Sequence, residues 1–305
     1  MTGQARRDHY LGVTFAIVSA LGFSGKAIFV KLAYAGAKID ATVLLTLRML
    51  FSAPFFALIA WRASRDASRP PLSRGDWMWL VWLAFVGYYA STYLDFWGLE
   101  YISAALERII LFTYPAWVLL ISAVWTRQPV RGRDIASLAL SFFGIAMSFV
   151  NDMRFVGPGP MVWKGSLLVF GASVVYSFYL LGSKHVVLRI GSQRFTAWVV
   201  ILAGLMMGTQ FVLTRPLSQL VHPPRVYWMS LALAVVSTVV PIICVVQALK
   251  RISPAMVAVC STIGPVLTIL MASVFLDEPL TMMQVVGALL VLAGVGLISR
   301  APVES

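Results

Sequence analysis

The stretch GLEYISAA at residues 98–105 recurs in altered form as ALKRISPA at residues 248–255, and the match runs without a gap to residues 149 and 299. At this fixed offset of 150, ten of fifty-two positions are identical. In the first copy these are Leu99, Ile102, Ser103, Ala105, Pro115, Leu120, Val124, Pro129, Leu140 and Gly144. Two apolar stretches match easily by chance, but here the prolines and the final glycine also correspond. The second half of the chain therefore repeats the first.

Composition places both copies in a membrane. Hydrophobic residues make up 60% of the chain and charged residues 12%, and the mean hydropathy is +0.86. Crossing about 30 Å of hydrocarbon takes roughly 20 apolar residues. We therefore predict an all-α integral membrane protein with ten transmembrane helices, and with little chain left for a soluble domain. The predicted spans are residues 10–33, 41–60, 76–97, 101–125, 134–150, 163–183, 195–214, 226–248, 255–276 and 281–299.

The net charge of +12 is interpreted as a topology signal rather than as a nucleic-acid surface. If the N-terminus is cytoplasmic, fifteen lysines and arginines fall on that side and six on the other. The cytoplasmic set is Arg6, Arg7, Arg62, Arg65, Arg69, Arg74, Arg127, Arg131, Arg133, Lys184, Arg189, Arg194, Lys250, Arg251 and Arg300. The opposite set is Lys31, Lys38, Arg154, Lys164, Arg215 and Arg225. This bias predicts a plasma-membrane protein with both termini in the cytoplasm.

Five helices in each half place the two halves in opposite orientations, because an odd number of crossings reverses the direction of the chain. We therefore predict two inverted five-helix repeats, at residues 1–152 and 153–305. Internal repeats of this kind are typical of secondary transporters, which bind substrate near the midplane between the repeats.

Enzyme chemistry finds little support in the sequence. The chain has no GxxxxGK[ST] phosphate-binding loop and no HExxH motif. Cys244 and Cys260 lie inside predicted spans, and the three histidines lie at span ends or in loops, so neither a disulfide nor a metal site is expected. We predict no catalytic residue, no metal and no cofactor.

Few ionisable residues fall deep in the predicted spans, where an unpaired charge is costly. Lys26 lies near the middle of the first span and is predicted to contact substrate, with snorkelling toward the interface as the alternative. Glu107 is its expected partner. The adjacent Arg108 must face a different helix, because neighbouring residues on a helix diverge by about 100°. For Arg48 a structural contact and a substrate contact stay open, and Asp95 is expected at the membrane interface.

Prolines interrupt the predicted spans at matched places. Pro115 and Pro265 end the tripeptides TYP and IGP in spans four and nine, and Pro241 lies in span eight. A proline inside a helix removes one backbone hydrogen bond, which membrane proteins tolerate beside a cavity or neighbouring helices. The three prolines are predicted hinges, with packing kinks as the alternative. Tyr114 and Thr262 are predicted to supply polar groups to a substrate site beside them.

Tyrosines extend this site. Tyr89 and Tyr93 are four residues apart and share one helix face, and Tyr176 and Tyr179 form a similar pair in span six. Trp163 lies at the outer end of that span. These five rings are predicted to surround an apolar or aromatic substrate group, although core packing alone also explains such spacing.

The stretch VFLDEPLT at residues 274–281 resembles the signature of EamA-type members of the drug/metabolite transporter superfamily. The stretches GLEYISAA and ALKRISPA, each leading to a matched proline, carry the same resemblance. Other matching positions are Gln284, Gly287 and Gly294, and the pairs Ser24 with Lys31 and Ser177 with Lys184. The resemblance implies ten helices in two inverted bundles around a cavity lined by spans one, three, four, six, eight and nine. For the mechanism we also predict that the tight turn at residues 277–279 acts as a rigid elbow.

One position departs from the family pattern. Where the pattern often has Glu before the proline of the last hairpin, the first half has Gln128 before Pro129. If that carboxylate has a role, Glu278 must supply it.

These observations predict an exporter of small metabolites. A buried ammonium at Lys26 attracts carboxylates, so amino acids with aromatic or apolar side chains are the expected substrates, and the cavity resembles that of the amino-acid exporter branch, including the aromatic amino acid exporters. If Glu107 neutralises Lys26, a multidrug, quaternary ammonium or nucleoside exporter is the alternative. An intramembrane enzyme or lipid-handling scaffold is the alternative of another class. The expected partners are a small-molecule substrate and membrane lipid, without nucleic acid, and the chain is expected to be monomeric.

Overall fold

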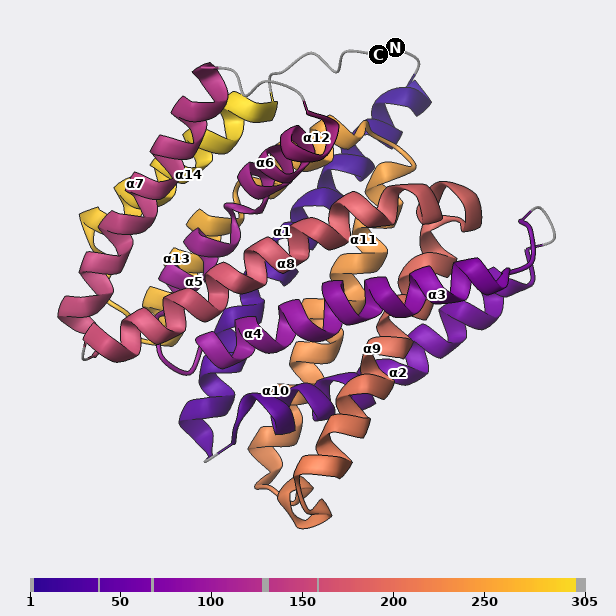
Figure 1. Ribbon diagram of the computed structural model, residues 1–305, viewed down its shortest axis with the longest axis horizontal. Helices are drawn as coiled ribbons and strands as arrows, with labels where there is room; N and C mark the ends of the chain where they lie inside the picture. Colours follow the sequence, from indigo (N-terminus) through magenta and orange to yellow (C-terminus); the bar gives the residue numbers. More distant parts are fainter. Residues whose placement is uncertain (1–2, 38, 67–68, 128–131, 158, 300–305) are drawn as a thin grey trace.

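The computed structural model describes residues 3–37, 39–66, 69–127, 132–157 and 159–299, which fold mainly into α-helices joined by short loops (Figure 1). Within them, seven helices are long and apolar enough to cross a membrane. They are Arg7–Gly36, Ala41–Ser64, Ala104–Trp125, Asp134–Phe155, Gly159–Ile190, Ser192–Thr214 and Pro224–Leu249. Two shorter apolar helices, Val259–Phe275 and Met282–Leu297, follow. The chain is thus a multi-pass, all-helical membrane protein, as predicted.

The same order of elements occurs in each half of the chain: two long helices, a helix with a π-helical segment, a helix in two pieces, and a last helix. In the first half these are α1 (Gly3–Gly36), α2 (Ala41–Ser64), α3 (Arg74–Leu83), η1 (Ala84–Ala90), α4 (Ser91–Gly98), α5 (Ala104–Leu111), α6 (Tyr114–Thr126) and α7 (Gly132–Phe155). In the second half they are α8 (Gly159–Ile190), α9 (Ser192–Thr214), the 3-10 helix η2 (Leu217–Leu220), α10 (Pro224–Ala234), η3 (Val235–Val239), α11 (Val240–Leu249), α12 (Pro254–Ser261), α13 (Gly264–Phe275) and α14 (Met282–Ser299).

The predicted spans 101–125 and 255–276 are each two helices rather than one, and proline explains both breaks. Pro115 lies in the first turn of α6 and Pro265 in the first turn of α13. Proline cannot continue a helix from the preceding turn, but it fits the first turn of a new one. Thr113 and Thr262 lie at the two breaks, and each hydroxyl donates to the carbonyl oxygen three residues earlier, at 2.6 Å.

The π-helical segments η1 and η3 were not expected from the sequence. Each lies in the middle of a longer helical rod, between α3 and α4 or between α10 and α11. Pro241 follows η3 in the first turn of α11, and its carbonyl oxygen accepts a hydrogen bond from Ser19 Oγ at 3.0 Å. Since a π segment carries extra residues per turn, it turns the following side chains to a new direction.

The helix α1 runs through the centre of the bundle, where it packs against α5, α10, α11, α12 and α13. At one edge, α7 packs along α14 (Figure 1). Small residues let these two backbones approach closely. Ser137 Oγ donates to the carbonyl oxygen of Gly294 at 2.5 Å, and a β-carbon placed at Gly287 would lie 2.6 Å from the carbonyl oxygen of Gly144.

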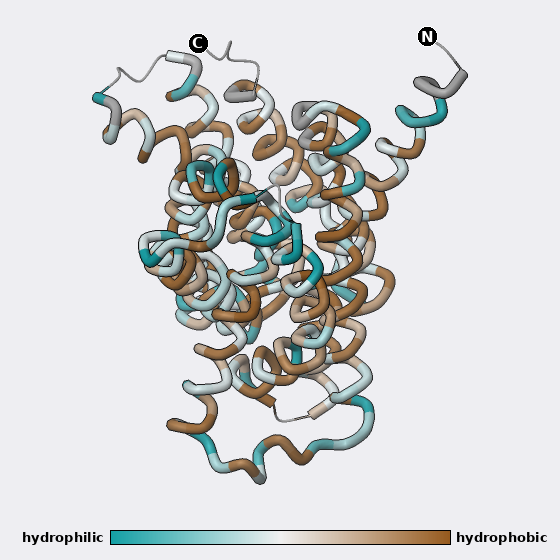
Figure 2. The backbone as a smooth tube through the Cα atoms, turned by 90° about the vertical axis from the view of Figure 1, so that its right-hand side faces the viewer, coloured by the Kyte–Doolittle hydropathy of each residue, from teal (hydrophilic) through white to brown (hydrophobic). Residues whose placement is uncertain are grey.

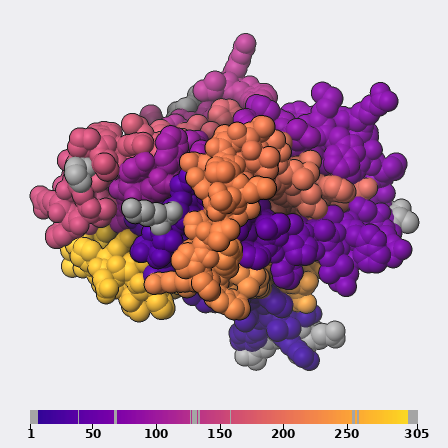
Figure 3. Space-filling view, turned by 90° about the horizontal axis from the view of Figure 1, so that it is seen from below, coloured from indigo at the N-terminus to yellow at the C-terminus, as the bar shows by residue number. Residues whose placement is uncertain are grey.

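The surface is that of a protein surrounded by lipid. Figure 2 shows long hydrophobic stretches along the helices, interrupted by hydrophilic segments. Large apolar side chains such as Trp82, Phe143 and Leu205 are more than half exposed. The first turns of α1 and the last turns of α14 lie at the same end of the bundle (Figures 1 and 2). Seen from below, the segment from α9 through η2 to α10 lies across the face of the molecule (Figure 3, orange). An ion pair between Arg215 in this segment and Asp40 connects it to the start of α2.

Candidate functional site

A buried ion-pair cluster joins three helices in the middle of the protein. Lys26 Nζ on α1 lies 2.5 Å from Asp95 Oδ2 on α4 and 2.7 Å from Glu107 Oε1 on α5. The exposed fraction of the three side chains is 14%, 5% and 0%. The predicted pairing of Lys26 with Glu107 is confirmed. The interfacial position expected for Asp95 is wrong, because this carboxylate faces α1 from the inner side of its helix.

This cluster, here called the Lys26 triad, holds two carboxylates against one ammonium. Among the described residues, Asp95 Oδ1 and Glu107 Oε2 are buried without a hydrogen-bond partner. Buried charges are costly unless they are paired and hydrogen-bonded, so ionisable groups at membrane depth indicate a functional site. The triad leaves two acceptor oxygens open and no positive charge in excess.

Arg108 provides the positive charge that Lys26 does not. Its guanidinium lies 5.0 Å from the centre of the Phe112 ring, and its Nε is buried with no hydrogen-bond partner among the described residues. It faces the start of α13, where a β-carbon placed at Gly264 would lie 2.8 Å from Nη2. Glu107 and Arg108 therefore face different helices, as their spacing predicted, and Gly264 leaves the room that the guanidinium occupies. No role was predicted for Arg108 beyond this direction.

Arg48 is a second buried guanidinium, on α2. Its Nε donates to Thr238 Oγ1 at 3.0 Å, and its carbon Cζ lies 5.3 Å from the centre of the Phe96 ring. Thr238 belongs to the π-helical segment η3, and its own hydroxyl donates to the carbonyl oxygen of Leu233 at 3.0 Å. These contacts bridge α2 to η3, while Nη1 of Arg48 is buried without a partner among the described residues, so both roles stay open.

The two broken helices are each held by a serine from the first helix of the other half. Ser24 Oγ on α1 donates to the carbonyl oxygen of Gly264 at 3.1 Å. Ser177 Oγ on α8 donates in the same way to the carbonyl oxygen of Tyr114 at 3.0 Å. Both carbonyls belong to the residue directly before the break proline. The serines that carried the family resemblance thus contact the predicted hinges.

The predicted tyrosines form two groups. Tyr114 and Tyr176 meet edge to face with centroids 5.5 Å apart, and Tyr179 stacks on Tyr176 at 5.5 Å. Tyr89 and Tyr93 stack at 6.4 Å, and Tyr93 Oη lies 3.4 Å from Thr42 Oγ1 on α2. The first group joins α6 to α8 and includes the break that Ser177 contacts, whereas Tyr179 is itself buried against neighbouring rings.

Two further predicted site residues make local contacts. Trp163 is 55% exposed near the start of α8 and packs on Phe149 of α7, with centroids 4.7 Å apart. Its predicted place in the substrate cavity stays a prediction. The Thr262 hydroxyl donates to the carbonyl oxygen of Val259, so it serves the helix break.

Two carboxylates from distant segments hold the start of α5, which carries Glu107 and Arg108. Glu278 Oε1 accepts a hydrogen bond from the Ala104 N–H at 3.0 Å. Asp152 accepts from the N–H and the hydroxyl of Ser103 at 2.7 and 2.8 Å. Glu278 follows Asp277, whose φ of 53° makes a tight turn. Negative groups at the start of a helix are stabilising, so this turn fixes the helix that bears the site.

A family model named EamA-like transporter family matches the chain twice, over residues 10–150 and 163–300. A relative named uncharacterized transporter YcbK, from Bacillus subtilis strain 168, is 31% identical over 290 residues, covering 92% of this chain and 90% of the relative. An uncharacterized transporter from Archaeoglobus fulgidus is 24% identical over 283 residues, covering 92% and 94%. The protein PagO of Salmonella typhimurium is 22% identical over 172 residues, covering 56% and 55%.

A solved crystal structure has the same fold. It superimposes with a TM-score of 0.62 and 18% sequence identity, and the match covers 94% of this chain and 95% of the other. At this level of identity the likeness concerns the fold alone.

Proposed function

Because the chain belongs to the EamA-like transporter family, we propose that it is a secondary exporter of small metabolites that works by alternating access between two inverted five-helix repeats. The repeats are residues 1–152 and 153–305, and both termini are cytoplasmic. The clear excess of lysines and arginines on one side supports this orientation. The shared end of α1 and α14 supports an even number of crossings.

Reciprocal contacts support the inverted arrangement. Gly144 meets Gly287, and Ser137 meets Gly294. At the repeat offset of 150, Ser137 corresponds to Gly287 and Gly144 corresponds to Gly294, so each pair joins the two positions that the other pair joins, with the halves exchanged. Moving along α7 from residue 137 to 144 moves back along α14 from 294 to 287, so the two helices are antiparallel. Reciprocal contacts, in which position i of one copy meets position j of the other and j meets i, are expected when a twofold axis relates the two copies.

Amino acids with apolar or aromatic side chains are the proposed substrates, as in the amino-acid exporter branch. The observation that carries this proposal is the buried guanidinium of Arg108, whose Nε has no partner among the described residues, on the same helix as Glu107 of the Lys26 triad, where two carboxylate oxygens are also without a partner. Arg108 binds the substrate carboxylate, in place of Lys26, whose charge the triad already neutralises. The open oxygens of Asp95 and Glu107 bind the substrate ammonium, and the rings of Tyr114 and Tyr176 line the path of its side chain.

A second candidate rests on the charge of the triad itself. Two carboxylates around one ammonium leave a net negative charge if Arg108 is not counted. Such a site suits quaternary ammonium compounds and other organic cations. The two candidates differ in whether transport depends on Arg108.

Counterflow into liposomes separates them. We expect purified protein to exchange labelled phenylalanine, tyrosine or leucine without ATP. Arg108→Gln is expected to lower this exchange on the order of 10- to 100-fold, the range for one hydrogen bond to a charged group. Arg154→Gln, an exposed arginine at the end of α7, is the matched control and is expected to behave as wild type. Exchange of tetraethylammonium but not of amino acids, unchanged in Arg108→Gln, would establish the second candidate instead.

The prolines at the breaks are expected to matter for transport more than for folding. Pro115→Ala, Pro241→Ala and Pro265→Ala each replace a residue in the first turn of a helix, where alanine is accepted, so stability should change by less than about 1 kcal/mol. Counterflow should fall several-fold, because the bundles bend at these points. Pro54→Ala, an exposed proline inside α2, is the control. Wild-type counterflow in all three variants would show that the prolines are packing features.

A further inference from the structure

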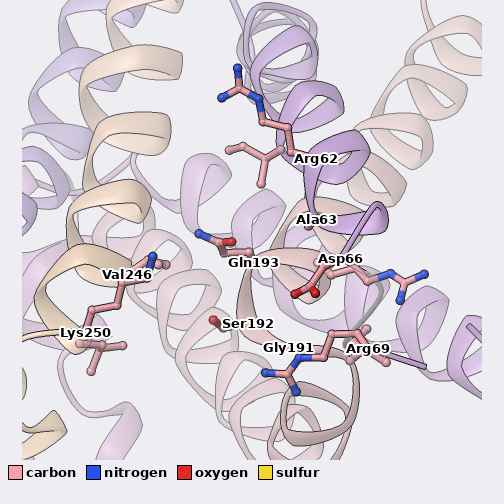
Figure 4. Close-up of a pocket in the computed structure, with 13 residues that line it drawn as sticks. Arg62, Ala63, Asp66, Arg69, Gly191, Ser192, Gln193, Val246 and Lys250 are labelled. Atoms are coloured by element: carbon pink, nitrogen blue, oxygen red, sulfur yellow. The ribbon is translucent and has the colours of Figure 1, made fainter. Parts of the chain in front are cut away.

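A basic pocket lies at the end of the bundle near the start of α1, outside the Lys26 triad. It encloses about 580 Å³ between the end of α2, the turn from α8 to α9, and the end of α11. Figure 4 shows Val246 and Lys250 on one side, Arg62 and Asp66 on the other, and Gln193 between them. The adjoining Arg251 and Ile252 pack against Gly12 of α1. The pocket is therefore on the face that the charge bias predicts to be cytoplasmic.

The charges of this pocket are strongly unbalanced. Four cations line it, Arg62, Arg69, Arg194 and Lys250, with Asp66 as the one carboxylate among its described lining residues. Arg194 donates from Nη1 to the carbonyl oxygen of Pro70 at 2.8 Å, and its Nε is buried without a partner among the described residues. The excess of positive charge fits an anion.

An apolar slot continues from the floor of the pocket into the membrane region. It holds about 80 Å³ between α2, α9 and α11, and it shares Ile59, Gln193 and Val246 with the pocket above. Most of its other lining is apolar and includes Phe56, which is fully buried. Ile243, also on its wall, is 43% exposed, so the slot is reachable from the lipid side.

We propose that this pocket and slot bind one anionic phospholipid. The phosphate lies among Arg62, Arg69 and Lys250, and an acyl chain enters the slot beside Ile243. The basic pocket suits the anionic headgroup of such a lipid, and the adjoining apolar slot suits an acyl chain. Basic pockets between transmembrane helices bind anionic headgroups in this way. The bound lipid bridges α2 of the first half to α9 and α11 of the second, so it stabilises one arrangement of the two halves.

The test compares lipid binding to the purified full-length protein in a neutral detergent, by native mass spectrometry and by the shift of Tm. Dioleoylphosphatidylglycerol is the probe, dioleoylphosphatidylcholine the control with a zwitterionic headgroup of zero net charge, and glycerol 3-phosphate a glycerol-linked phosphate without acyl chains. We expect wild type to bind the phosphatidylglycerol and to gain Tm, with no gain from the other two. The triple variant Arg62→Gln, Arg69→Gln, Lys250→Gln should lose affinity on the order of a hundredfold.

The matched control removes three charges from the same face outside the pocket. The variant Arg7→Gln, Arg65→Gln, Arg74→Gln is expected to keep the affinity and the Tm shift of wild type. Equal losses in the two triple variants would overturn the proposal, since general surface charge would then explain binding. Equal binding of the two lipids, or an equal Tm gain from glycerol 3-phosphate, would also overturn it. The Tm of each variant without lipid shows that it is folded.

Discussion

Lys26→Met is expected to destabilise the protein by about 3–5 kcal/mol, because it leaves two buried carboxylates side by side without their cation. Methionine keeps most of the volume of lysine, so the loss measures charge rather than packing. Chemical unfolding of the purified protein in detergent gives the difference. Lys164→Met is the control. That lysine donates to Tyr101 Oη at an exposed position, so its loss should cost less than about 1 kcal/mol.

A triple variant separates stability from transport. Combining Lys26→Met with Asp95→Asn and Glu107→Gln removes all three charges and keeps the shapes, so most of the lost stability should return. Amino-acid counterflow should stay low in the triple variant, because the acceptors for the substrate ammonium are then neutral. If Lys26→Met were as stable as Lys164→Met, the triad would not hold α1, α4 and α5 together as the structure indicates.

The pairing of Lys26 with Glu107 could be predicted from the sequence, whereas the participation of Asp95 could not. Lys26 and Glu107 both fall at membrane depth, where an isolated charge is costly, so their pairing follows from energetics alone. Asp95 lies close to the end of its predicted span, and depth alone cannot tell an inward-facing carboxylate from an interfacial one. The same limit applies to Trp163, whose predicted place in the cavity does not follow from its position at the end of a span. Which side of a helix faces the bundle depends on packing, and hydropathy is high on both sides of a membrane helix.

Local helix geometry was predictable where proline dictates it. Pro115 and Pro265 correctly indicated breaks, because the missing N–H acts within one turn. The π-helical segments η1 and η3 carry no such residue signal within them, and they depend on contacts from other helices, such as that of Arg48 with Thr238. The hydrogen-bond partners of Ser24 and Ser177 could not be predicted from the sequence either, because the accepting carbonyl groups belong to the opposite half of the chain.

The close contact between α7 and α14 links the duplicated sequence to the stability of the whole bundle. A β-carbon at Gly287 would lie 2.6 Å from the Gly144 carbonyl oxygen and 2.5 Å from Ser148 Oγ. A backbone atom cannot turn aside as the end of a flexible side chain can. At Gly294 the nearest groups are likewise the Ser137 carbonyl oxygen and Ser141 Oγ, at 2.7 and 2.6 Å. The two helices therefore need small residues at both places.

Gly287→Leu is accordingly expected to destabilise the protein by about 3 kcal/mol or more, because leucine forces the backbones of α7 and α14 apart. Gly208→Leu is the matched control, since a β-carbon at Gly208 has no described atom within 4 Å and the same substitution there should be tolerated. Yield of monodisperse protein and unfolding in detergent give the comparison. Although Gly287 is not part of the Lys26 triad, we expect transport to fall in Gly287→Leu, because the contact between α7 and α14 is lost. In the proposed alternating-access mechanism, the contact between α7 and α14 is the fixed edge at which the two halves are held together. Equal stability of the two leucine variants would mean that this edge is loosely packed and does not serve as that support.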